Sequence, residues 1–214
     1  EALARGAWEE ARSAFEVELA REESPEALEG LGLTAWWLDR GDRVFETRER
    51  SYILYRERGD RGAAARLAVW LAWDYSAFRG ERSVAKGWLQ RARRLLDGLA
   101  PAPEHSFLEL REGVFALVED GDPDLALAHA KAGIAAAQAV GSTDFEMIGR
   151  ALAGFARVTA GKVARARGAR RSERGDRGRG AQGSGGDRAR ILLPDLRVRA
   201  RPRLRARRGV VPPP

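Results

Sequence analysis

The chain of 214 residues offers few side chains that could carry out a chemical reaction. His105 and His129 are its only histidines, and no serine or carboxylate is spaced with them as in a catalytic triad. Cysteine is absent, which excludes thiolate nucleophiles, thiolate metal sites and disulfides. We therefore predict no enzyme activity, no cofactor and no metal site, and we expect ordinary packing or surface roles for both histidines.

Other motifs that carry chemistry are also missing. The acidic pairs Glu9-Glu10 and Glu22-Glu23 are neighbours in sequence, so on a helix their side chains do not face one site. There is no GxxxxGK[ST] loop, and the glycine-rich stretch 175–186 lacks the flanking strand and helix of a phosphate-binding loop. No apolar run is long enough to span a membrane, and no signal peptide is present, so we expect a cytoplasmic protein without a membrane partner.

Charge divides the chain into two parts. Residues 1–163 hold 22 basic and 27 acidic residues, a net charge of −5, whereas residues 164–214 hold 16 arginines and four acidic residues, a net charge of +12. The overall net charge of +7 therefore describes neither part. We predict a folded domain over residues 1–163 and a separate Arg/Gly/Pro-rich tail over residues 164–214. Because the chain begins without a methionine, we interpret it as a fragment of a longer protein.

A glycine followed by a polar or small residue recurs between amphipathic stretches of the first part. These glycines are separated by 35, 39, 41 and 40 residues, and they are Gly6, Gly41, Gly80, Gly121 and Gly161. Glycine readily adopts the positive φ that ends a helix, so each one is predicted to mark a turn between two helices. No segment alternates polar and apolar residues for long enough to suggest a sheet. The sequence therefore predicts an all-α fold.

Small residues follow these glycines at a fixed distance. Ala11, Ala85 and Ala126 each lie five residues after their glycine, whereas Glu46 occupies this place after Gly41. Seven residues further along, small residues return at Ala92 and Gly133. Since an offset of seven keeps residues on one helical face, these positions should let a neighbouring helix approach closely. We predict that Ala85 and Ala126 are buried against the preceding helix of their own unit.

These features resemble the tetratricopeptide repeat, whose pattern has a turn followed by alanine, an aromatic residue and alanine. The resemblance covers residues 1–163 and implies a right-handed α-solenoid of about four antiparallel helix pairs. The period of about 40 residues exceeds the usual 34. Leu31-Gly32, which resembles the Leu-Gly pair of the family, also lies two residues early. In this long-period form, rich in tryptophan and arginine, the region looks most like the repeats of LuxR-type bacterial transcriptional regulators.

In those regulators the repeats bind a protein partner or sense a small-molecule effector, and a separate C-terminal helix-turn-helix binds DNA. This chain contains no such helix-turn-helix, so the resemblance implies an interaction or ligand-sensing fragment that does not itself contact DNA. Two alternatives stay open. One is a free-standing tetratricopeptide scaffold that is unrelated to transcription. The other is nucleic-acid binding through the arginine-rich tail, because arginines neutralise phosphates.

The resemblance also predicts a binding surface. In tetratricopeptide arrays, the positions ten and six residues before the turn face the inner groove. The aromatic and charged residues at these positions are Trp70, Asp74, Arg111, Phe115 and Phe155. Such a mixed surface would suit an extended peptide or another helix. The alternative for each of the six tryptophans is packing between helices.

The tail has three interpretations. A nucleic-acid arm would use its arginines, although the tail lacks the aromatic residues on which bases stack. A disordered extension would fit its composition. Out-of-frame translation is the interpretation we favour, because arginine codons of the CGN type, shifted by one base, become codons for Ala, Gly, Asp, Glu or Val. Back-translation of residues 191–213 then permits a next-frame string, RDFERAGAWC, that resembles another second helix of the repeat.

Overall fold

The computed structural model describes the backbone of residues 2–177 and the side chains of residues 2–162 and 165. The chain divides into two units, residues 1–170 and 171–214, and the packed helices belong to the first. The helices are α1 (Trp8–Leu19), α2 (Pro25–Trp37), α3 (Gly41–Arg58), α4 (Arg61–Asp74), α5 (Arg82–Leu96), α6 (Pro103–Val118), α7 (Pro123–Ala139) and α8 (Thr143–Arg177). No strand occurs among residues 2–177, so the all-α prediction is confirmed. The predictions of disorder or out-of-frame translation concern residues 164–214. Residues 164–177 are helical, as part of α8, rather than disordered, and residues 178–214 lie outside the described residues.

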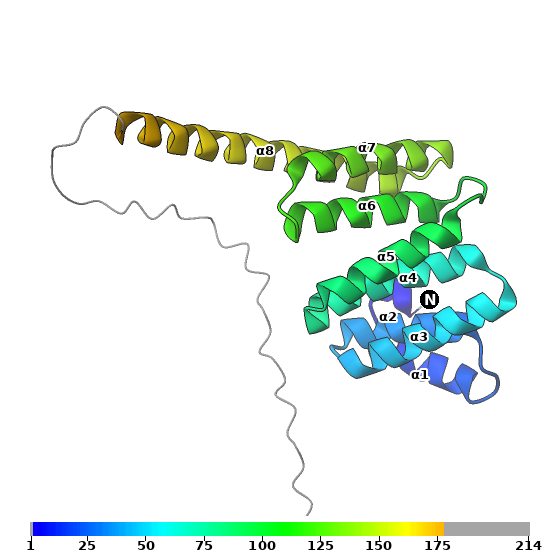
Figure 1. Ribbon diagram of the computed structural model, residues 1–214. Helices are drawn as coiled ribbons and strands as arrows, with labels where there is room; N and C mark the ends of the chain where they lie inside the picture. The colour runs from blue at the N-terminus through cyan, green and yellow to red at the C-terminus, as the bar shows by residue number, and fades with distance from the viewer. Residues whose placement is uncertain (1, 178–214) are drawn as a thin grey trace, which may run out of the picture. The chain divides into compact units, whose positions relative to one another are not determined.

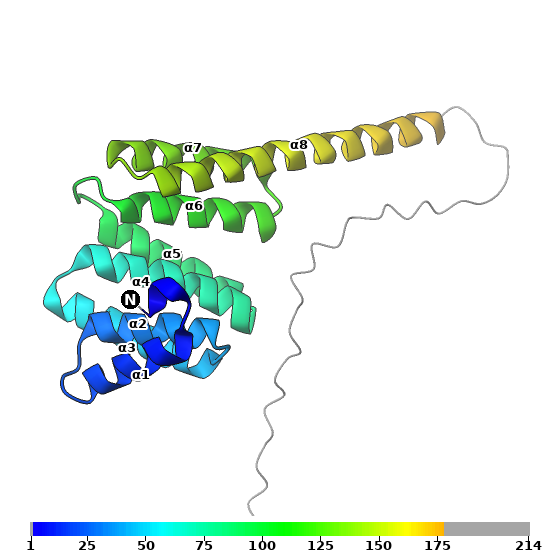
Figure 2. The ribbon, with the colours of Figure 1, turned by 180° about the vertical axis from the view of Figure 1, so that it is seen from behind.

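The helices stack in chain order as antiparallel neighbours, from α1 at one end to α7 and the first half of α8 at the other (Figures 1 and 2). The most extensive packing joins α2 to α3, α4 to α5, and α6 to α7. These are the helix pairs that the glycine repeat predicts, with Gly80 and Gly121 between their members and Gly41 at the start of α3. The sequential helix pairs are therefore confirmed. No helix in the described part of the chain is long and apolar enough to cross a membrane.

Most of the glycine turns form as predicted. Gly6, Gly80 and Gly121 have φ values of 70°, 68° and 65°, which is the left-handed conformation that glycine adopts without strain. The turn near Gly41 is also in place, but Gly41 is the first residue of α3 and Asp39 carries the positive φ of 60°. Aspartate is one of the few residues that tolerate this conformation when glycine is displaced.

The predicted turn at Gly161 is wrong. Helix α8 runs from Thr143 through Gly161 to Arg177 without interruption. One glycine inside a helix costs only about 1 kcal/mol, and the flanking residues, mostly alanine and arginine, are strong helix formers. No proline follows to stop the helix within this stretch. The predicted domain boundary at residue 163 therefore falls inside α8, and the first unit extends to residue 170.

The small residues lie where the repeat predicts. Ala85 and Ala126 are completely buried, and Ala126 packs with Ala116 of α6 and Ala156 of α8. Gly133 is equally constrained, because a Cβ atom there would lie 2.7 Å from Leu110 Cδ2 of α6. Each pair thus depends on positions where only a small side chain fits.

The pair α2–α3 achieves its close approach in a different way. Its second helix has Glu46 at the alanine position, and Glu46 is exposed. The small residue is instead on the first helix, where a Cβ on Gly32 would lie 2.9 Å from Thr47 Oγ1 and 3.0 Å from Arg48 Cγ. The departure of this unit from the repeat therefore moves the small residue from α3 to α2 and leaves the antiparallel pairing intact.

Candidate functional site

Three of the five residues predicted to line a groove meet between α4 and α6. Trp70 and Asp74 lie four residues apart on one face of α4. Arg111 of α6 places its Cζ 5.6 Å from the centroid of the Trp70 ring. Arg48 of α3 reaches the same place, with its Cζ 4.8 Å from that ring and its Nη1 donating a 2.5 Å hydrogen bond to Asp74 Oδ2. Four side chains from three helices therefore form one cluster.

The ion pair at the base of this cluster is buried. The side chains of Arg48 and Asp74 are 2% and 0% exposed, and Asp74 Oδ1 has no hydrogen-bond partner among the described residues. Burial raises the pKa of Asp74 above its usual value, although the positive charges of Arg48 and Arg111 oppose this shift. One carboxylate thus interacts with two guanidinium groups, and the cluster carries an excess positive charge when all three groups are ionised.

Arg111 supplies that excess charge. Its guanidinium lies against three aromatic rings, with Cζ 4.4 Å from Trp73, 5.5 Å from Phe107 and 5.6 Å from Trp70. It donates no hydrogen bond to another described residue, and its Nε is buried without an acceptor. Desolvation lowers the pKa of Arg111 to about 10, and Asp74 only partly offsets this effect. The rings stabilise the cation without neutralising it, so an additional carboxylate or phosphate would be attracted here.

The other two predicted groove residues lie elsewhere. Phe115 is buried in the central core and supports the stack from inside rather than offering a surface. Phe155 is exposed on α8 and does not join the cluster. The alternative role predicted for the tryptophans applies to Trp88, which is buried with its ring 5.0 Å from that of Tyr52. Of the residues predicted to line a groove, Trp70 and Arg111 thus come together, and both are partly exposed.

Sequence reasoning missed Arg48, Trp73 and Phe107. A signal for Arg48 existed, because it interrupts an otherwise uncharged and largely apolar face of α3 with helical spacing. The other buried residues of α3 are Val44, Phe45, Thr47, Ser51, Tyr52 and Tyr55. A charged residue among buried neighbours requires a partner of opposite charge. The identity of that partner, 26 residues away on α4, could come only from the structure.

A second cluster of charged side chains joins α5, α6 and α7. His129 Nδ1 lies 2.8 Å from Glu109 Oε2 and 3.6 Å from Glu112 Oε2. Arg93 pairs with both carboxylates, at 2.9 Å from Glu109 Oε1 and in a closer contact with Glu112. The imidazole and the two carboxylates could hold a divalent cation. Because the Arg93 guanidinium pairs with both acids and protonated His129 supplies the second positive charge, this arrangement is an ion-pair network.

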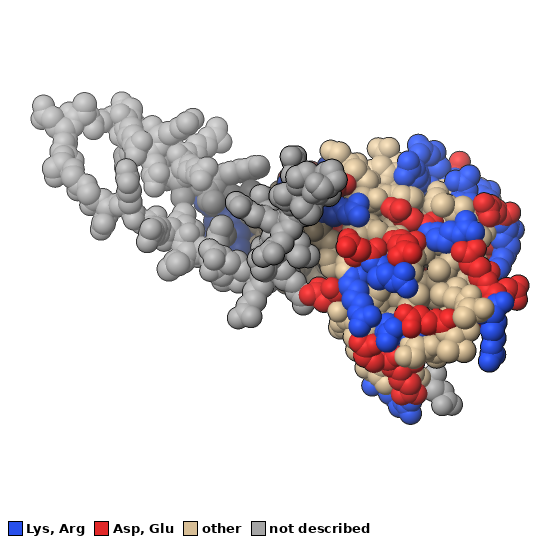
Figure 3. Space-filling view, turned by 90° about the horizontal axis from the view of Figure 1, so that it is seen from below, with Lys and Arg blue, Asp and Glu red and all other residues tan. Residues whose placement is uncertain are grey.

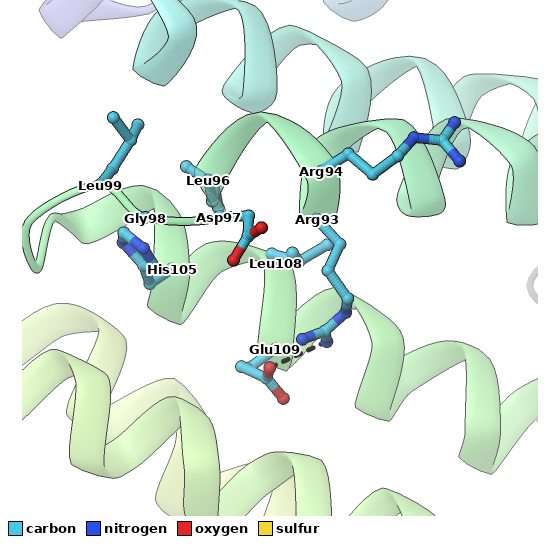
Figure 4. Close-up of a pocket in the computed structure, with 9 residues that line it drawn as sticks. All are labelled: Arg93, Arg94, Leu96, Asp97, Gly98, Leu99, His105, Leu108 and Glu109. Atoms are coloured by element: carbon cyan, nitrogen blue, oxygen red, sulfur yellow. Dashed lines mark hydrogen bonds and ion pairs between the residues drawn. The ribbon is translucent and has the colours of Figure 1, made fainter.

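A pocket of about 510 Å³ adjoins this network at the end of α5 (Figure 4). It is lined by Arg93, Arg94, Leu96, Asp97, Gly98, Leu99, His105, Leu108 and Glu109. His105 belongs to the start of α6, where the backbone N–H of Ala102 donates a 3.3 Å hydrogen bond to its Nδ1. This hydrogen bond gives His105 a capping role at the start of α6. The Arg93–Glu109 ion pair lies at the edge of the pocket (Figure 4).

The ion-pair network predicts a dependence of stability on pH. The hydrogen bond to Glu109 raises the pKa of His129 above its ordinary value of 6.5. Protonated His129 therefore stabilises the fold below about pH 6.5, and this contribution is lost as the pH rises through the raised pKa. We expect His129→Gln to lower the melting temperature at pH 5.5 and to have a smaller effect at pH 8.5. An equal loss at both pH values, measured by thermal denaturation, would contradict the charged pair.

The face of the stack at its α1 end carries basic and acidic side chains side by side (Figure 3). Ion pairs tie α3 to the chain before it: Arg50 pairs with Glu23 in the loop before α2, and Arg58 pairs with Glu26 of α2. Such exposed pairs each contribute little to stability. A face on which the two signs alternate has no broad positive field to attract a nucleic-acid backbone.

No protein-family model matches the chain, and neither a curated protein nor a solved structure is significantly similar to it.

Proposed function

We propose that the described helices form a right-handed solenoid of tetratricopeptide type that binds a protein or peptide partner at Arg111. The observation that carries this proposal is the largely buried guanidinium of Arg111, which lies among three aromatic rings and donates no hydrogen bond to a described residue. A largely buried guanidinium that has no hydrogen-bond acceptor is costly to a fold. A carboxylate supplied by a partner would remove that cost, so the site favours binding.

The chemistry of the cluster defines the partner. A carboxylate can accept two parallel hydrogen bonds from one guanidinium, which fixes its orientation as well as its affinity. The Trp70 and Phe107 rings lie 5.3 Å apart and would contact an apolar side chain next to that carboxylate. Arginine and tryptophan are also the residues that contribute most to binding energy at interfaces. The proposed partner is an extended peptide or helix with Asp or Glu beside an apolar residue; a small-molecule acid would use the same contacts.

The proposed setting is a cytoplasmic LuxR-type transcriptional regulator, in which partner binding by the repeats would control a separate DNA-binding domain. DNA would then be contacted only through a helix-turn-helix outside this chain. The alternative is a free-standing scaffold that binds the same kind of partner. The nucleotide sequence around codons 160–170 and downstream separates these proposals, because a helix-turn-helix encoded in either frame supports the regulator and its absence supports the scaffold.

The binding proposal predicts the outcome of a selection of random peptides on the immobilised protein. We expect the enriched peptides to carry Asp or Glu next to an aromatic or aliphatic residue. Arg111→Gln should weaken their binding roughly 10- to 100-fold, which corresponds to the loss of a charged hydrogen bond. The matched control is Arg21→Gln, which removes one positive charge from an exposed position and should leave affinity unchanged. Selected peptides that bind Arg111→Gln as tightly as the original chain would contradict the proposal.

A further inference from the structure

Helix α8 has an apolar face that no described residue covers. Met147, Ile148, Phe155 and Val158 are between 51% and 66% exposed, and Ala151 beside them is exposed as well. The opposite face of α8 is buried against α6 and α7 through Leu152, Ala153 and Ala156. A contiguous apolar strip on an otherwise charged surface is typical of an interaction site.

The exposed strip has the spacing of a coiled-coil seam. Its central residues are separated by four, three, four, three and four positions, and they are Asp144, Ile148, Ala151, Phe155, Val158 and Lys162. This alternation of fours and threes is the pattern by which two helices pack along each other. The strip has an acid at its first position and a base at its last, with only apolar residues between them.

We propose that α8 pairs with α8 of a second copy of this chain in an antiparallel coiled coil, with a two-fold axis at the level of Ala153. The strip is symmetric about this residue. Ile148 then faces Val158 of the second copy, and the small Ala151 faces the large Phe155, twice in each case. Because bulky and small residues alternate across the axis, the two helices can approach closely without a steric clash.

Charge complementarity sets the direction of the pairing. In the antiparallel arrangement, Asp144 of each copy faces Lys162 of the other, and both residues are exposed. A parallel arrangement would place Asp144 against Asp144 and Lys162 against Lys162, which is repulsive. Arg157 and Arg165 add further positive charge toward the second half of this segment, whereas Glu146 at its start already pairs with Arg150 within α8. The antiparallel direction alone brings Asp144 and Lys162 together.

Sedimentation velocity of the full chain over a micromolar concentration series tests this proposal. We expect a reversible monomer–dimer equilibrium that Phe155→Glu shifts to monomer, because two carboxylates would be buried at the seam. The matched control is Val17→Glu, which introduces the same charge at a similarly exposed apolar residue of α1 and should leave the dimer unchanged. Circular dichroism checks that each variant keeps its helix content.

Charge reversal tests the register itself. Asp144→Lys and Lys162→Asp should each weaken the dimer roughly tenfold, and the double variant should restore it, because the two charges exchange places across the axis. A chain that stays monomeric at every concentration would overturn the proposal, and slow amide exchange in such a monomer would identify another segment as the occupant of this face. A dimer that tolerates Phe155→Glu, or that the double charge reversal fails to restore, would also overturn it.

Discussion

Replacing Ala126 with arginine is expected to lower the free energy of unfolding by about 3–5 kcal/mol. Ala126 is completely buried where α7 meets Ala116 of α6 and Ala156 of α8. An arginine there would both exceed the available volume and bring an unpaired charge into the interface. Ala85→Arg should have a similar effect between α4 and α5, since Ala85 is also completely buried.

Urea denaturation provides the measurement, and α7 provides the control. Ala132 is exposed on the same helix, so Ala132→Arg makes the same substitution in the same element without entering an interface. We expect Ala132→Arg to change stability by no more than about 0.5 kcal/mol. If Ala85→Arg and Ala126→Arg were as stable as Ala132→Arg, the repeat register would be wrong.

Asp74→Asn is the second change with a large expected effect. It would leave the buried Arg48 without its counter-charge while Arg111 stays close by. Removing one member of a buried ion pair typically costs about 3–5 kcal/mol, mostly because the remaining charge stays desolvated. Thermal and urea denaturation of the variant should therefore show a marked loss of stability.

The double variant Arg48→Met/Asp74→Leu separates the loss of the ion pair from the loss of shape. Because it removes both charges and keeps similar volumes, it should recover most of the stability that Asp74→Asn loses. A double variant that is no more stable than Asp74→Asn would show that the two residues act through packing. It would also remove the reason for regarding the cluster as a site of uncompensated positive charge.

The pairing of helices could be predicted from the sequence because it depends on local chemistry. Glycines such as Gly80 and Gly121 specify turns, and alanines at fixed offsets specify close packing. The prediction fails at Gly161 because one glycine cannot end a helix whose neighbours strongly favour helix. The turn predicted at Gly41 is displaced because Asp39 adopts the positive φ expected of glycine. Both errors arise where a neighbouring residue overrides the preference of the glycine.

The candidate site could be predicted only in part. The positions that face the groove in tetratricopeptide arrays identify Trp70, Asp74 and Arg111, which do come together. These positions cannot show that Phe115 is buried. They also give no sign of the cluster around His129, because its acids lie about twenty residues away on another helix. Contacts between helices depend on the rotation of each helix about its axis. Sequence periodicity determines that rotation too coarsely to pair individual charged side chains.

A crystal structure of the chain with its tightest selected peptide would show whether Arg111 binds a carboxylate of a partner. We expect a carboxylate oxygen of the peptide within about 2.7–2.9 Å of the Arg111 guanidinium, with an adjacent apolar side chain against Trp70 or Phe107. A peptide bound on another face of the helical stack, with Arg111 still lacking an acceptor, would contradict such binding.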